Sequence, residues 1–216
     1  VLMEESESED TYVDVVNGAQ IDCGLTSPHF VTNAEKHVCE LDNPYILAVS
    51  SEIPNIRKIQ GVLEHVIKQG RALLIVAPVA QSVKSALLMN KVKGNIKVNI
   101  VDPPGFGPTK KDAIEDLAIL TGCTVINEEL GDDLDLITPE HLGEVEFAVT
   151  DDKSTTITMD CTTNEVLQRI VEVKNKIAEE KNGFIKKKLE DRLATLSGSV
   201  GVIKSRSSPS SSFITV

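Results

Sequence analysis

Short apolar runs alternate with segments of helical periodicity through the middle of the chain. The apolar runs are rich in β-forming residues and lie at residues 45–49, 73–77 and 96–101. The helical segments carry apolar side chains at three-to-four spacing and cover residues 53–68, 81–92 and 110–121. This alternation predicts an α/β fold in which neighbouring strands are parallel and joined by right-handed crossovers.

Further β signals predict a second sheet layer. They lie at residues 19–24, 145–149, 154–159 and 200–204. Before the last of them, two helices are predicted as a hairpin beside the sheets, separated by Gly183 and stopped at Gly198. The first has Thr162 or Thr163 as its cap. The apolar stripes of the two helices are Val166, Ile170, Val173 and Ile177, and Ile185, Leu189, Leu193 and Leu196.

The two ends differ from this patterned region. The N-terminal segment, residues 1–13, contains the acidic run EESESED, and residues 205–216 are rich in serine. Such compositions bury too little apolar surface to offset the entropy of ordering, so we expect disorder in both. The patterned region between them, residues 14–204, shows no repeat and no linker, which favours one domain.

Composition limits the classes of partner. The chain has 216 residues, 41% of them hydrophobic but only 3% aromatic, so its core must be built from aliphatic side chains. The net charge is -11, which argues against a nucleic-acid or anionic-membrane surface because either needs clustered Lys and Arg.

Cysteine and histidine are scattered and follow no metal-binding spacing. The chain shows no secretory leader and no long apolar span, so free thiols in a reducing compartment and no bound metal are expected. The residues concerned are Cys23, Cys39, Cys123, Cys161, His29, His37, His65 and His141.

No catalytic constellation can be assembled. Ser27 lies in TSPHF, which favours a turn over a nucleophile elbow. The adjacent acids Glu128 and Glu129, and Asp132 and Asp133, are candidates for general acid and base, although such pairs are usually solvated.

The PGFG motif at 104–107 is the candidate for phosphate binding, since it follows a predicted strand and precedes a helix. It lacks the third Gly of a dinucleotide loop and the Lys-Ser/Thr of a P-loop. Pro103 and Pro104 also remove two backbone donors. A structural turn is the better interpretation.

The helices predicted at 53–68 and 81–92 have apolar stripes wider than one buried face needs. Periodicity alone favours simple burial of both helices against the sheet. The alternative is an apolar groove between them that receives a segment of another protein, for which Met89 is well suited as an adaptable thioether. The stripe residues are Ile56, Ile59, Val62, Leu63, Val66 and Ile67, and Val83, Ala86, Leu87, Leu88, Met89 and Val92.

Three segments together resemble a known family. They are DPPGFGPTKKDAIEDLAILTGCTVI at 102–126, LDNPYILAVSSEIPNI at 41–56, and KLEDRLATLSGSVGVIK at 188–204. They resemble the substrate-binding apical domain of the bacterial-type (group I) chaperonin, the GroEL family, from about Asp14 to Lys204. The resemblance implies a layered β/β/α arrangement with a C-terminal helical hairpin, and it favours the groove over simple burial.

The resemblance also implies a client site made of the two helices and a preceding turn. The same site in the family accepts the mobile loop of the co-chaperonin lid. The matching positions are Leu25, His29, Phe30, Gln60, Leu63, Glu64, Leu88 and Met89, with Lys84 one turn earlier. His29, Gln60 and Lys84 depart from the apolar character of the family, which implies weaker general affinity or a narrower set of clients.

The family's hinge glycines match Gly18 and Gly198, with Ser199 where a second exit glycine is expected. The ATPase domain of the family lies outside the matched region. The resemblance therefore implies a chain that is not an enzyme and holds no cofactor, with ATP and Mg belonging to the parent chaperonin.

The implied partners are unfolded polypeptides and the co-chaperonin, within a homo-oligomeric ring. The expected compartment is the cytoplasm, or alternatively an organelle matrix or stroma. Two other hypotheses remain open. One is a small α/β enzyme or nucleotide-binding domain that uses the PGFG turn, and the other is a divergent structural module without clients.

Overall fold

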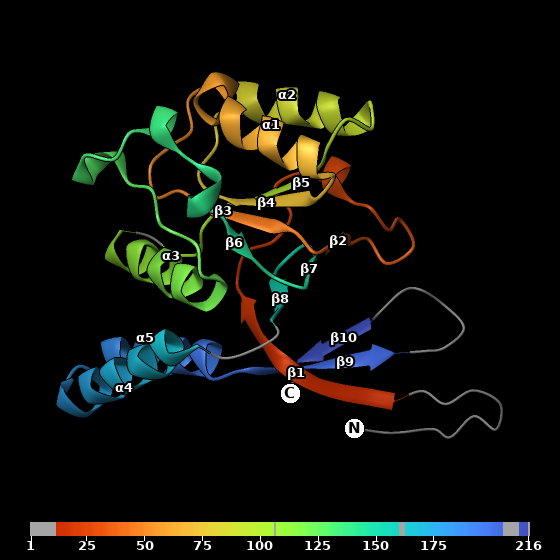
Figure 1. The fold of residues 1–216 in the computed structure, drawn as a ribbon. Helices are drawn as coiled ribbons and strands as arrows, with labels where there is room; N and C mark the ends of the chain where they lie inside the picture. Colours follow the sequence, from red (N-terminus) through yellow and green to blue (C-terminus); the bar gives the residue numbers. More distant parts are fainter. Residues whose placement is uncertain (1–11, 106, 160–162, 205–211, 216) are drawn as a thin grey trace, which may run out of the picture.

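A computed structural model of the chain describes residues 12–105, 107–159, 163–204 and 212–215 (Figure 1). Within these residues the fold is mixed α/β, with two sheets and five α-helices. The helices are α1 (Gln60–Gln69), α2 (Gln81–Val92), α3 (Pro108–Thr121), α4 (Asn164–Glu179) and α5 (Gly183–Leu196). No helix of the described part is both long enough and apolar enough to cross a membrane.

The smaller sheet contains the three strands predicted from the apolar runs. Its order is β5-β4-β3-β6, and the β3–β4 and β4–β5 pairs are parallel, as the alternating pattern predicted. The short strand β6 adds to β3 in the antiparallel sense. The strands are β3 (Tyr45–Ala48), β4 (Ala72–Val76), β5 (Lys97–Val101) and β6 (Gly143–Glu144).

The larger sheet is antiparallel throughout and has the order β10-β9-β1-β8-β7-β2. The second sheet expected from the outlying β signals is therefore present. Its strands are β1 (Tyr12–Ile21), β2 (Cys39–Asp42), β7 (Phe147–Thr150), β8 (Thr155–Met159), β9 (Ser199–Lys204) and β10 (Ser212–Thr215).

The smaller sheet is buried on both faces. Side chains of one face, such as Leu47 and Ile75, pack with α1 and α2, while those of the other face, such as Ile46 and Leu74, pack with α3 and the larger sheet. The alternation of a strand sends successive side chains to opposite faces, so every residue of β3 and β4 is buried. Figure 1 shows α1 and α2 over one face and α3 on the opposite side.

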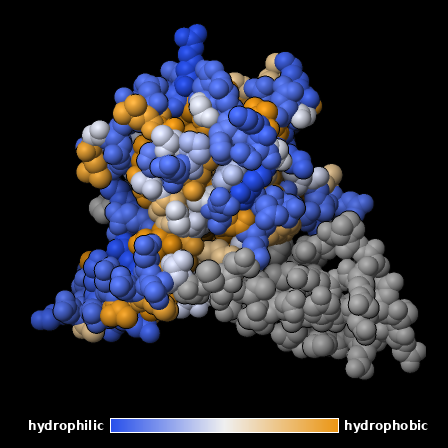
Figure 2. Space-filling view, viewed as in Figure 1, coloured by the Kyte–Doolittle hydropathy of each residue, from blue (hydrophilic) through white to orange (hydrophobic). Residues whose placement is uncertain are grey.

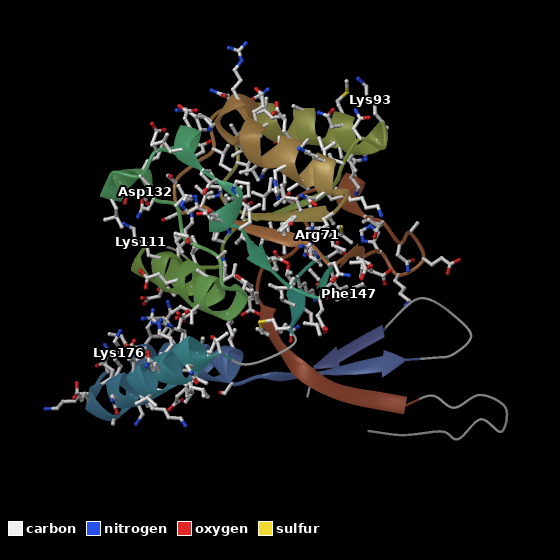
Figure 3. All side chains as sticks on the ribbon, viewed as in Figure 1. Arg71, Lys93, Lys111, Asp132, Phe147 and Lys176 are labelled. Atoms are coloured by element: carbon white, nitrogen blue, oxygen red, sulfur yellow. The ribbon has the colours of Figure 1, made fainter. Side chains whose placement is uncertain are left out.

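An arginine ties one end of the smaller sheet together. Arg71, labelled in Figure 3, donates through Nη1 to Glu144 of β6 at 2.8 Å and through Nε to the carbonyl of Asn43 at 2.8 Å. Its guanidinium lies 3.9 Å from the ring centroid of Tyr45. The ends of β3, β4 and β6 are thus joined by one side chain.

The predicted helical hairpin is confirmed as α4 and α5. Thr163 caps α4 and accepts a hydrogen bond from the amide of Val166 at 3.4 Å. The hairpin packs on α3 and β1 through a third apolar cluster that includes Val173 and Leu196. Gly183 is the first residue of α5 rather than a break within a helix, because α4 already ends at Glu179 and Asn182 caps α5.

The helix predicted from residue 53 begins later. Ile53 is extended and pairs with Val79, because the residue before a proline is driven out of the helical region. Asn55 then caps a 3-10 turn at Ile56–Ile59, which leads into α1. The first turn of the predicted helix is therefore a separate element.

Three strands lie where none was predicted, and the shortest is β6, which directly precedes the predicted run at 145–149. β2 has only four residues, and two of them are acidic, so its alternation was too short to detect. β10 lies in the serine-rich tail that was expected to be disordered, and it pairs with β9. Phe213, Ile214 and Thr215 are good strand formers, and the rest of the tail and residues 1–11 lie outside the described residues.

Candidate binding groove

A groove with a volume of about 240 Å³ lies between α1 and α2. The helices are adjacent because both pack on the same face of the smaller sheet (Figure 1). The residues that line it come from the 3-10 turn before α1, from both helices, and from the residue before β5. They are Ile56, Gln60, Leu63, Glu64, Ile67, Leu87, Asn90 and Ile96.

The floor of the groove belongs to the core, and its rim is exposed. Leu63 and Leu87 are 8% and 1% exposed and pack in the cluster beneath the helices. Ile67, one turn after Leu63, is 49% exposed. The apolar stripe of α1 is wider than the sheet can cover, so its edge remains in contact with solvent.

Three polar side chains also line the groove. Gln60 donates through Nε2 to Oε1 of Glu64 at 2.7 Å, one turn along α1. Asn90 donates to the carbonyl of Ala86 in α2 at 2.9 Å. The groove therefore combines an apolar floor with a polar edge on each helix.

The turn segment that precedes β2 lies against α2. The ammonium of Lys91 donates to the carbonyls of His29 at 3.2 Å and Val31 at 3.4 Å, and also to the carbonyl of Phe30. Burial lowers the pKa of Lys91 from its ordinary value. This lysine joins the turn to the helix.

The predicted residues of this turn have different surroundings. His29 is exposed and Leu25 is half-buried, with Leu25 packed against the core. Phe30 is 1% exposed. Its side chain is part of the core, so the expectation that Phe30 offers apolar surface to a client needs correction: the sheet and α2 already use that surface.

The three predicted binding residues on α2 also differ in exposure and in contacts. Met89 is 60% exposed, and Leu88 is partly buried against the core. Lys84 forms an ion pair with Asp102, with its Nζ 3.6 Å from Oδ1. None of the three is among the residues that line the groove.

Of the nine predicted binding residues, Gln60, Leu63 and Glu64 line the groove. Sequence reasoning selected positions by alignment and so missed other lining residues. The width of the apolar stripes already indicated three of them, since it included Ile56, Ile67 and Leu87. No sequence signal pointed to Asn90 or Ile96.

The two predicted hinge glycines are neighbours in space. Gly18 lies in β1, and Gly198 lies between α5 and β9. A Cβ built on Gly198 would lie 3.3 Å from the carbonyl oxygen of Gly18 and 3.1 Å from that of Ala194. The predicted entry and exit of the domain therefore meet at one point, where a side chain at position 198 has little room.

Pro104, Gly105 and Gly107 of the PGFG motif lie before α3, while Phe106 is outside the described residues. Gly105 and Gly107 both have positive φ, of 86° and 57°, which explains why glycine occupies them. Pro108 is the first residue of α3, a position where a missing N–H costs nothing. This geometry fits the structural turn that the sequence favoured.

Three of the four acidic residues considered for catalysis serve as caps or ion-pair partners. Asp132 accepts from the amide of Asn127 at 2.9 Å, and Asp133 accepts from the amide of Asp135 at 2.9 Å. Nζ of Lys111 in α3 donates a hydrogen bond to Oε2 of Glu129 at 2.6 Å, and this bond lowers the pKa of Glu129. Lys111 and Asp132 are labelled in Figure 3.

Hydrophobic residues on the face seen in Figure 2 form small separate patches among hydrophilic ones. No group of three or more His, Cys, Asp or Glu side chains within the described residues could hold a metal ion. No protein-family model matches this chain.

Proposed function

We propose that this chain is the apical domain of a bacterial-type chaperonin. It binds exposed apolar segments of non-native proteins, and the mobile loop of a co-chaperonin, in the groove between α1 and α2. The groove supports the proposal best, because its floor is apolar and its rim includes a large side chain, Ile67, left half in solvent. An apolar groove between two helices is a common receptor for a segment of another protein.

The arrangement of layers is compatible with this proposal. The helices that frame the groove, the smaller sheet and the larger sheet follow one another, with the hairpin of α4 and α5 at the far side (Figure 1). We propose that this is the apical-domain layering of the family. The chain itself would bind clients passively, and ATP hydrolysis would belong to another part of a ring-forming parent chaperonin.

Ile67 provides a cleaner test than Leu63 or Leu88. Leu63→Glu would place a charge in the core, so its melting temperature would fall for reasons unrelated to binding. Leu63 is only 8% exposed, so a loss of stability in this variant would mask any effect on binding.

Ile67→Ser should weaken binding of an apolar peptide about fivefold, because it removes roughly 1 kcal/mol of apolar burial. It should also reduce suppression of aggregation when a chemically denatured protein is diluted into the assay. The melting temperature should change by no more than a few degrees. Binding is measured by fluorescence anisotropy and stability by calorimetry.

Leu167→Ser is the matched control, since Leu167 is 52% exposed but lies on α4, away from the groove. It should leave peptide binding unchanged. Equal affinities for the two variants and the original chain would reject the groove as the client site.

A further inference from the structure

Glu64 is the one charged residue among the described residues that line the groove. Its side chain is exposed at the edge of an otherwise mostly apolar channel. A carboxylate in that position costs solvation when an apolar segment covers it, unless the segment supplies a partner. The nature of that partner follows from what already surrounds the carboxylate.

Gln60 occupies only one oxygen of this carboxylate. Its amide group must present Nε2 to Glu64, because a carboxylate is an acceptor, and the contact of 2.7 Å is to Oε1. Within the described part of the chain, the other oxygen, Oε2, has no hydrogen-bond partner and no cation within 4.0 Å. Room for a donor remains at this edge.

The lysines near the groove are mostly engaged elsewhere. Lys58 pairs with Asp135 at 2.5 Å, Lys84 pairs with Asp102 at 3.6 Å, and Lys91 binds backbone carbonyls of the turn segment. Lys68 follows Glu64 by one turn of α1 but makes no ion pair with it. Lys93, labelled in Figure 3, lies at the outer end of α2.

We infer that the groove selects apolar segments that carry a lysine or arginine side chain. Apolar residues of the segment would pack on Ile56 and Ile67 above the floor at Leu63, and the cation would reach Oε2 of Glu64. The hydrogen bond from Gln60 holds the carboxylate at the edge of α1, which makes the contact directional. This inference rests on the proposed function and explains how a polar residue at position 60 narrows the range of clients.

The test compares three peptides that share one apolar sequence and differ at a single central position, which is Lys, Gln or Glu. With the original chain, the Lys peptide should bind about threefold to fivefold more tightly than the Gln peptide, as expected for a partly exposed ion pair. The Glu peptide should bind more weakly than the Gln peptide by a similar factor, because like charges would meet in the groove. Anisotropy titrations at low salt measure all three affinities.

Two variants of Glu64 assign the effect to its charge. Glu64→Gln should bind the three peptides with nearly equal affinity, and Glu64→Lys should favour the Glu peptide. Glu190→Gln removes an exposed carboxylate on α5, far along the chain from the groove, and should preserve the original order. Circular dichroism and melting curves of each variant show whether it is folded.

The outcomes separate this inference from the proposed function. If the original chain binds all three peptides equally, charge selection is rejected while apolar binding stands. If the preference for Lys persists in Glu64→Gln, another group is responsible and the inference is also wrong. If no peptide binds and aggregation is not suppressed, the proposed function itself fails.

Discussion

The side chain of Leu63 contributes both to the hydrophobic core and to the surface of the groove. It is buried in the same cluster as Val62 and Val66, yet it also forms part of the groove floor. A bound segment would therefore contact residues that the core already holds in fixed positions. Such preorganisation lowers the entropy cost of binding.

Three cysteines provide a prediction about pH. Burial raises the pKa of Cys23, Cys39 and Cys123 from 9.0 to about 11, since the thiolate is disfavoured away from water. The unfolded chain loses these protons at lower pH than the folded chain. Their stabilising contribution is therefore complete below pH 9 and is lost as the pH rises toward 11.

Cys39→Ala should make the stability less sensitive to alkaline pH. Between pH 8 and 10.5, the free energy of unfolding of this variant should fall by about 2 kcal/mol less than that of the original chain. Urea unfolding at both pH values measures the difference. Identical losses would show that the Cys39 thiol ionises as easily in the folded state as in the unfolded one.

At the scale of elements, a buried carboxylate joins α3 to the helical hairpin. Asp116 of α3 is 4% exposed and accepts from two guanidinium groups. Arg192 of α5 donates through Nε at 2.7 Å and Nη2 at 2.9 Å, and Arg169 of α4 donates through Nε at 2.9 Å. The hairpin is thereby fixed by directional contacts in addition to its apolar cluster.

Asp116→Ala should lower the free energy of unfolding by about 3 kcal/mol, because two largely buried cations lose their shared partner. Glu172→Gln is the control, since Glu172 contacts Arg169 at 3.3 Å from an exposed position and should cost less than about 1 kcal/mol. Urea unfolding gives both values. A smaller loss for Asp116→Ala than for Glu172→Gln would rule out this role for the carboxylate.

At the scale of the whole molecule, the net charge of -11 adds a long-range term to the selection proposed for Glu64. Attraction between an acidic domain and a basic segment raises the rate of encounter, and salt screens it over a distance of about 10 Å at 0.1 M. The net charge should therefore change the association rate constant more than the dissociation rate constant.

The association rate constant of the Lys peptide should fall several-fold between about 20 mM and 500 mM salt, while that of the Gln peptide changes little. Stopped-flow fluorescence separates association from dissociation. Equal salt dependence for the two peptides would show that the overall charge does not guide encounter.

Local periodicity predicted most elements of this fold, because each strand or helix is set by its own residues. The parallel strands, α2 and the hairpin are present as predicted, and Thr163 is the one of the two candidate threonines that caps α4. The errors lie where a neighbour decided the conformation: Pro54 delayed α1, and pairing with β9 ordered residues 212–215 of the serine-rich tail.

The sequence alone predicted an α/β chain with a second sheet and with two helices whose apolar stripes are wider than one buried face needs. Only the tertiary structure decided which of those apolar side chains remain at a surface. Phe30 became core while Ile67 stayed at a groove, and Asp116 met two arginines more than fifty residues away in sequence. Periodicity indicates which face of a helix or strand is apolar. Whether that face is exposed depends on which other elements cover it, and the covering elements are brought there only when distant segments of the chain pack together.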